Sequence, residues 1–162
     1  MVRKKDLIRL CEKHNDCVFL CFTNGTLIDE AFADDMLRVG NFIPAISLEG
    51  FESATDLRRG SGVYKKATDA MALLKRKKLI YGISACYTSA NFESITSEEF
   101  FDSLIEMGAY FIWYFHYMPV GNDASPESAD HLCAKCDRYA KEWTPVADEL
   151  WEKEKIIRAK KA

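Results

Sequence analysis

Residues 18–26, with the sequence VFLCFTNGT, decide the fold class of this chain. A run of apolar residues that ends in a polar turn is typical of a strand buried on both faces, as in a parallel sheet. After the turn, apolar residues recur at helical spacing from Leu27 to Leu37, and Gly40 ends the pattern. A buried strand followed by a helix predicts one unit of an α/β fold.

The same alternation continues in both directions from this stretch. A helix is predicted over residues 3–15, and a polar loop through Gly60 and Gly62 is expected after the second strand. Further strands are predicted over residues 42–48, 79–87 and 110–117, and further helices over 63–74 and 100–107. Strands at intervals of roughly 30 residues with crossover helices predict a parallel sheet, either open or part of a barrel.

The composition changes after Gly121, where Asn, Asp, Ser and Pro precede a helical pattern rich in Lys and Glu with Trp143 and Trp151. We therefore expect a β/α domain over residues 1–124 and a C-terminal helical tail over residues 125–162. Ser125 and the residues beyond it could cover one edge of the sheet.

Composition excludes several classes of partner. The 162 residues carry 22 basic and 25 acidic side chains, well mixed, with a net charge of −3, so neither nucleic acid nor a membrane surface is expected as a partner. No apolar run reaches the roughly 20 residues that span a bilayer, and no export signal is recognised. The six cysteines are thus expected to be reduced thiols, in a soluble cytoplasmic protein.

Polar residues follow each predicted strand, and in α/β folds ligands bind at these carboxyl ends. Three segments, FTNGTLID (22–29), ISLEGFESATDLRRGSGVYKKATDAMALLK (46–75) and YMPVG (117–121), resemble radical S-adenosylmethionine (radical SAM) enzymes. The resemblance covers roughly residues 5–121. It implies a partial (β/α) TIM-like barrel and iron-sulfur-dependent reductive cleavage of S-adenosylmethionine, for radical chemistry on an unidentified substrate such as a peptide.

The resemblance also implies cofactor-binding residues. Ser47, Glu49 and Arg59 match positions near the ribose and the amino-acid carboxylate of S-adenosylmethionine, and Met118 and Pro119 match positions beside its adenine. A guanidinium suits a carboxylate, and a serine hydroxyl suits either group.

Simpler roles exist for the polar members of this set. Asn24, which we include among the cofactor-binding residues, and Gly25 could form only a turn. Ser47 could satisfy backbone groups, and Arg59 could pair with Asp56; Arg58 is the weaker candidate of the two arginines.

The chain departs from the family pattern in two motifs of the N-terminal part. It has neither the C-x-x-x-C-x-x-C loop that holds a four-iron, four-sulfur (4Fe-4S) cluster nor the G-G-E-P stretch that binds the methionine amine. Cys17 and Cys21 have the first spacing, but Asn24 occupies the third position, so they are rejected as ligands. A truncated or degenerate radical SAM domain, inactive alone, is therefore predicted.

Two other functions remain open. A non-catalytic half-barrel could bind a nucleotide-like ligand, or form a homodimer or dock on a full-length enzyme through exposed sheet edges. A small metal or redox protein could use Cys133 and Cys136 with His131, although these are too few for a closed zinc site.

Two further features have local interpretations. His116, in an aromatic strand, could face the barrel interior as an acid or base or be a core residue. The basic residues 75–78 are interpreted as complementing a helix dipole, without a further function.

Overall fold

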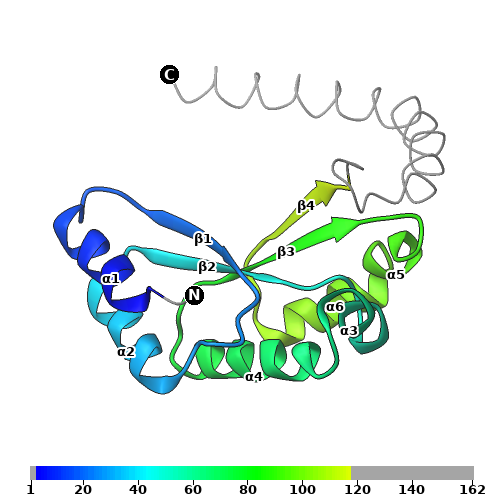
Figure 1. The fold of residues 1–162 in the computed structure, drawn as a ribbon, viewed down its shortest axis with the longest axis horizontal. Coiled ribbons are helices and arrows are strands. Elements are labelled where there is room, and N and C mark those ends of the chain that lie inside the picture. The colour runs from blue at the N-terminus through cyan, green and yellow to red at the C-terminus, as the bar shows by residue number, and fades with distance from the viewer. Residues whose placement is uncertain (1–2, 118–162) are drawn as a thin grey trace, which may run out of the picture. The chain divides into compact units, whose positions relative to one another are not determined.

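The computed structural model describes residues 3–117, and the structure of the chain is discussed for these residues alone (Figure 1). Met118 and Pro119, the three tail residues His131, Cys133 and Cys136, and the predicted helical tail all lie outside them. The four strands are β1 (Phe19–Thr23), β2 (Phe42–Ser47), β3 (Gly82–Tyr87) and β4 (Ile112–His116). The helices are α1 (Lys4–Lys13), α2 (Glu30–Val39), α3 (Glu52–Arg59), α4 (Val63–Arg76), α5 (Phe92–Ile95) and α6 (Glu98–Met107).

The sheet is fully parallel, with the strand order β1-β2-β3-β4. Each strand thus pairs with its neighbour in sequence, through a crossover that contains at least one helix. Right-handed crossovers between successive neighbours place all the connecting helices on one face, as in a barrel wall. Figure 1 shows α2, α4 and α6 together on one side of the strands. The predicted α/β fold, with the wall of a partial barrel, is confirmed.

Helix ends fall where the residues satisfy free backbone groups. The Asp29 carboxylate accepts a hydrogen bond from the Phe32 amide at 2.9 Å at the start of α2, and the Ser97 hydroxyl does the same for the Phe100 amide at the start of α6. Gly40 and Gly108, which end these helices, have φ angles of 74° and 91°. This left-handed conformation favours glycine, so both predicted helix ends are explained.

The core lies between the sheet and its helices. Ile46 and Ile83 from the central strands are fully buried there against Met71 and Leu74 of α4. Its other large members are Phe32, Met36, Leu48, Tyr81, Ile95 and Phe100. Since strand side chains alternate between faces, every second residue of β1 to β4 points away from these helices.

That opposite face is lined by small residues at its centre and aromatic residues at its edges. Ala45 pairs with Gly82 in the middle of the sheet. Phe22 of β1 nevertheless contacts Trp113 and Phe115 of β4, with ring centroids 6.1 and 5.2 Å apart. Strands three positions apart in a flat sheet are roughly 14 Å apart, so the sheet curves strongly and this face is concave.

Two helices were not predicted. Residues 52–59, expected as part of a polar loop, form helix α3, and the short helix α5 lies in the stretch before Phe100 that was expected as a polar loop. Residues 52–59 have only a few apolar residues and no helical period, because α3 buries little besides Thr55. Within residues 3–117, no helix has the length and apolar character needed to cross a membrane.

Candidate functional site

The centre of the site is Glu49, which follows β2 at the carboxyl end of the sheet and is fully buried. Arg58 donates from Nη1 to Glu49 Oε2 at 3.0 Å. Arg59 donates from Nε to Glu49 Oε1 at 2.9 Å and makes a second bond from Nη2 to the same oxygen. A single carboxylate therefore binds two guanidinium groups, whose side chains remain 37% and 27% exposed.

The loop after β3 is tied to the same carboxylate. The Cys86 amide donates to Glu49 Oε2 at 3.0 Å. Asn91, which is buried, donates to the carbonyl oxygens of Glu49 and Cys86 at 3.0 and 3.1 Å. Arg58 also donates to the Cys86 carbonyl at 3.2 Å. The ends of β2 and β3 and the last turn of α3 thus form one hydrogen-bonded unit around Glu49.

Charge interactions hold Arg58 in its ionised form. Partial burial acts to lower its pKa, but interactions with the Cys86 side chain and with the nearby Glu49 carboxylate act in the opposite direction. The net result is a raised pKa for Arg58. This guanidinium also lies over the Tyr117 ring, 5.9 Å from its centroid.

Asp56 has a different partner from the one considered in the sequence. Its carboxylate accepts hydrogen bonds from the amides of Gly62 and Tyr64, at 2.6 and 2.8 Å, and so caps the start of α4. The bonds from Tyr64 and Gly62 lower the pKa of Asp56. Both arginines, by contrast, point to Glu49, so the pairing of Arg59 with Asp56 does not occur.

Two serine hydroxyls lie next to this unit. Ser47 is the residue two before Glu49, is 8% exposed, and pairs in register with Ser84 of β3. Both serines lie on the concave face, on the side of Ala45 and Glu49. Within residues 3–117, neither hydroxyl makes a hydrogen bond, so the alternative that Ser47 only satisfies backbone groups gains no support. Ser84 was not singled out in the sequence, although it lies in a predicted strand.

Asn24 has the local role that its sequence allowed. It is exposed, and its side-chain oxygen accepts from the Thr26 amide at 3.2 Å and the Thr26 hydroxyl at 3.0 Å. This is an Asx turn after β1. Nothing in these contacts tests the predicted cofactor binding by Asn24, Ser47, Glu49 or Arg59.

His116 lies on the helix-bearing face of the sheet. It pairs in register with Tyr87, whose ring centroid is 5.1 Å from that of His116, and Tyr87 packs against the core. The side chain is exposed. The alternation along β4 sends Phe115 to the concave face instead, so the interpretation of His116 as an acid or base facing the barrel interior is wrong.

The described cysteines do not suit an iron-sulfur cluster. Cys17 is exposed before β1, whereas Cys21 lies in β1 on the side of the core. Burial raises the pKa of the Cys21 thiol, which opposes the thiolate form that binds iron. Residues 3–117 contain no group of three Cys, His, Asp or Glu side chains placed to hold a metal ion.

No protein-family model and no curated protein matches the chain. Solved structures do. Native anSMEcpe with bound AdoMet (S-adenosylmethionine) is 23% identical over 75% of this chain and 35% of that chain, with a TM-score of 0.58. SuiB of Streptococcus suis bound to S-adenosylmethionine is 19% identical over 85% of this chain and 31% of that chain, with a TM-score of 0.59. Native anSMEcpe with bound AdoMet and the Cp18Cys peptide is 23% identical over 75% of this chain and 37% of that chain, with a TM-score of 0.55.

The two proteins are radical SAM enzymes. Their barrels share the fold of this chain, as the sequence resemblance predicted. The chain spans about a third of their length. At these identities the likeness concerns the fold alone, which is radical-SAM-like.

Proposed function

We propose that this chain binds S-adenosylmethionine at the carboxyl ends of β2 and β3, as part of a barrel of the radical SAM type. The proposal is supported by the shared fold and by the bound S-adenosylmethionine in the similar structures. It also agrees with the sequence resemblance, which implies Ser47, Glu49 and Arg59 as cofactor-binding residues.

The observation that carries the proposal is the charge at the site. Two guanidinium groups share the single Glu49 carboxylate, which leaves one positive charge without a counter-charge among these three residues. Both arginines reach solvent at the end of the sheet. An excess guanidinium charge beside a buried network favours an anionic ligand group, such as the amino-acid carboxylate of S-adenosylmethionine.

Arg58 is as well placed for this contact as Arg59. Within residues 3–117, Arg58 makes its hydrogen bonds through Nη1 alone, so Nε and Nη2 remain for a ligand. Arg59 directs two of its nitrogens at Glu49 and keeps Nη1. We assign the two arginines jointly to the carboxylate, with Glu49 holding both in position.

The ribose would lie over the two serines. Ser47 and Ser84 lie side by side in register on the concave face, with hydroxyls that have no partner within residues 3–117. Ribose hydroxyls can both donate to and accept from them. When bound to an iron-sulfur cluster, S-adenosylmethionine is a source of the 5′-deoxyadenosyl radical, and a peptide substrate is proposed by analogy with the peptide-bound structure of anSMEcpe.

A non-catalytic ligand-binding half-barrel is the second candidate. The same arginines and serines would then hold a nucleotide-like ligand without an iron-sulfur cluster. The cysteines of residues 3–117 are not placed to bind such a cluster. Titration with S-adenosylmethionine and with a nucleotide such as AMP separates the two, because only the first function requires a preference for the amino-acid carboxylate over a phosphate group.

Calorimetric titration of the full chain with three related compounds tests the proposed site. S-adenosylhomocysteine keeps the amino-acid carboxylate, whereas 5′-methylthioadenosine lacks it. We expect S-adenosylmethionine and S-adenosylhomocysteine to bind and 5′-methylthioadenosine to bind about tenfold more weakly. Arg58→Ala and Arg59→Ala should abolish this difference, and Arg9→Ala, which alters an exposed arginine of α1, should preserve it.

Equal binding of all three compounds would refute the role of the arginines. Absence of binding by any of them would refute the cofactor proposal for this chain.

A further inference from the structure

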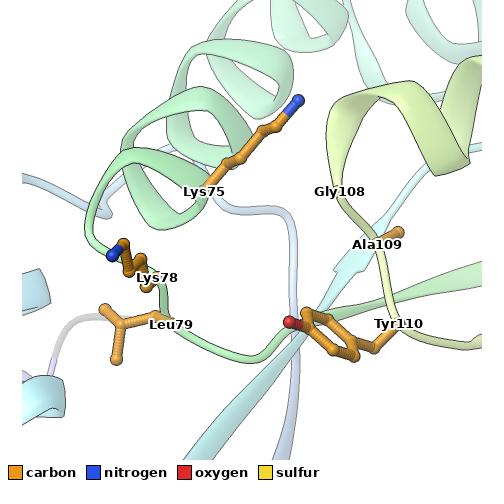
Figure 2. Close-up of a pocket in the computed structure, with 6 residues that line it drawn as sticks. All are labelled: Lys75, Lys78, Leu79, Gly108, Ala109 and Tyr110. Atoms are coloured by element: carbon orange, nitrogen blue, oxygen red, sulfur yellow. The ribbon is translucent and has the colours of Figure 1, made fainter.

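A second surface lies at the opposite end of the sheet, where the strands begin. A pocket of about 370 Å³ is lined by Lys75, Lys78, Leu79, Gly108, Ala109 and Tyr110 (Figure 2). These residues belong to the segments that precede β3 and β4. The Glu49 unit is at the other end of the same strands, so this surface is independent of the proposed cofactor site.

Two smaller pockets continue this one on both sides. A pocket of about 190 Å³ shares Ala109 and Tyr110 with it and is otherwise apolar, with Phe101 and Ile105 among its residues. A pocket of about 210 Å³ shares Lys78 and Leu79 and includes Leu37 and Ile80. The three pockets form a groove along the amino ends of β2, β3 and β4, which we call the lower groove.

The lower groove is apolar at both ends and positive at its centre. Leu37, Ile80 and Ile105 expose 56%, 50% and 70% of their surface at its ends. Lys75 and Lys78 lie at the centre, and no acidic side chain lines any of the three pockets. Lys75 donates to the Glu106 carbonyl at 2.6 Å. The Lys78 side chain has no hydrogen bond or ion pair with any residue of the described range.

The other two basic residues of the 75–78 segment are used differently. Arg76 pairs with Glu30, and Lys77 pairs with Glu30 and Asp34, so both bind α4 to α2. Their charges are thereby balanced within the domain. Within the 75–78 segment, Lys78 is the basic residue whose side chain contacts neither a carboxylate nor a carbonyl oxygen of residues 3–117.

The backbone of Lys78 supports this distinction. Helix α4 ends in a Schellman motif, since the Lys78 amide donates to Lys75 and the Leu79 amide to Leu74. Helix α6 ends in the same motif at the same pocket, with Gly108 in the corresponding position. Lys78 has a φ of 56° and is the one non-glycine residue with positive φ among residues 3–117. A lysine occupies the position where glycine is preferred, which indicates that its side chain has a use.

From these observations we infer that the lower groove docks an acidic peptide segment of a partner protein, with a carboxylate on Lys78 and one apolar side chain in each flanking pocket. The positive charge at the centre of the groove favours a carboxylate on the peptide, and the exposed apolar residues at the two ends favour apolar side chains on either side of it. The amino ends of β2 and β4 are roughly 10 Å apart, and alternate residues of an extended peptide lie on one side at intervals of roughly 7 Å. The two Leu side chains of a Leu-x-Asp-x-Leu sequence are therefore roughly 14 Å apart, which lets them reach past these strand ends into the two flanking pockets, lined also by residues of α6 and α2.

A fluorescein-labelled peptide with the sequence Ser-Leu-Ser-Asp-Ser-Leu-Ser tests the inference by fluorescence anisotropy with the full chain at low salt. We expect binding that weakens at least fivefold when the peptide Asp is replaced by Asn, and at least fivefold when its two Leu are replaced by Ala. Lys78→Gly should weaken binding to the same extent while the protein stays folded. Two further variants serve as comparisons. Lys66→Gly changes an exposed lysine of α4 that lies outside the groove, and Tyr110→Ala changes a residue that lines it.

Tyr110→Ala should weaken binding, and Lys66→Gly should leave it unchanged. Absence of binding would overturn the inference. It would also be overturned if the Lys78→Gly protein bound the peptide as tightly as the unaltered protein does and the Asn peptide bound as tightly as the Asp peptide. Self-association of the free protein that Lys78→Gly abolishes would overturn it as well, since the occupant would then be a second copy of this chain.

Discussion

Glu49 shows how much of the site depends on one side chain. Its two carboxylate oxygens accept from Arg58, Arg59 and the Cys86 amide, and it is fully buried. A buried carboxylate of this kind is tolerated because it is paired and fully hydrogen-bonded. Removing its charge would leave two adjacent guanidinium groups that repel each other.

We therefore predict that Glu49→Gln lowers the free energy of unfolding by about 2 kcal/mol. This is below the roughly 3–5 kcal/mol lost when a fully buried pair is broken, because both arginines reach solvent. Urea unfolding measures the change. Asp69→Asn, which removes the same charge from the exposed pair with Lys65, is the matched control and should have almost no effect. Equal effects of the two substitutions would contradict the assignment of Glu49 as the centre of the site.

Tyr81 and Tyr114 predict how stability depends on high pH. Burial raises the pKa of each phenol from 10.0 to about 12, and each hydroxyl donates to a backbone carbonyl, of Met107 and Ile95 respectively. A raised pKa in the folded state stabilises the protein fully below the unfolded value near 10 and loses this effect as pH rises towards 12.

Stability should thus be flat from pH 8 to 9.5 and fall above roughly pH 10. Tyr114→Phe should lower the free energy of unfolding by about 1 kcal/mol at pH 8, through the lost hydrogen bond, and make the fall at high pH shallower. Urea unfolding at pH 8 and pH 11 provides the comparison. An unchanged pH dependence in Tyr114→Phe would show that ionisation of this phenol does not contribute to the loss of stability at high pH.

At the scale of the elements, the C-terminal ends of α4 and α6 have the same backbone motif and can be compared directly. Both have Schellman motifs at the lower groove, with Lys78 in one and Gly108 in the other. Any side chain except glycine is strained at positive φ. The two positions should therefore respond in opposite directions to substitution.

Lys78→Gly should raise the free energy of unfolding by about 1 kcal/mol, since it relieves the left-handed strain. Gly108→Ala should lower it by about 1–2 kcal/mol, because φ is 91° and the new Cβ would lie 3.1 Å from Lys75 Cγ. Thermal and urea unfolding of both variants give the measurement. If Lys78→Gly is instead destabilising, the side chain contributes to the fold itself, and its assignment to a partner loses its main support.

The elements also show which parts of the fold the sequence could predict. The strands over 18–22 and 42–48 were found because burial on both faces gives continuous apolar runs. Helix α3 was missed because it is held by Arg58, Arg59 and Thr55, which bind the Glu49–Gly50 segment rather than packing an apolar stripe. Polar contacts between distant residues leave no periodic signal.

The candidate site was predictable to a similar degree. Glu49 and Arg59 were singled out by the family resemblance and Arg58 was considered the weaker of the two arginines, but nothing in the sequence showed that all three bind one another. The face chosen for His116 could not be fixed, since a one-residue change of register moves a strand's side chains to the opposite face. Ser84 was missed because a lone serine inside an apolar strand has no distinguishing pattern.

At the scale of the whole described domain, the sheet is a curved wall with one covered and one open face. The helices cover the convex face, while Phe22, Trp113 and Phe115 expose 47%, 51% and 38% of their surface on the concave one. Within residues 3–117, β1 and β4 each pair on one side only. A concave apolar face between two edge strands favours association, either with a second copy or with a partner protein.

We predict that the purified chain self-associates through this face. Sedimentation velocity should show species larger than a monomer that increase with concentration, and Phe22→Lys should reduce them because an inward charge on an edge strand opposes strand pairing. Leu57→Lys, at a side chain of α3 that is 87% exposed and away from the sheet, is the control for added charge. If the chain is monomeric at every concentration, or if both variants behave alike, the concave face is not the surface through which copies meet.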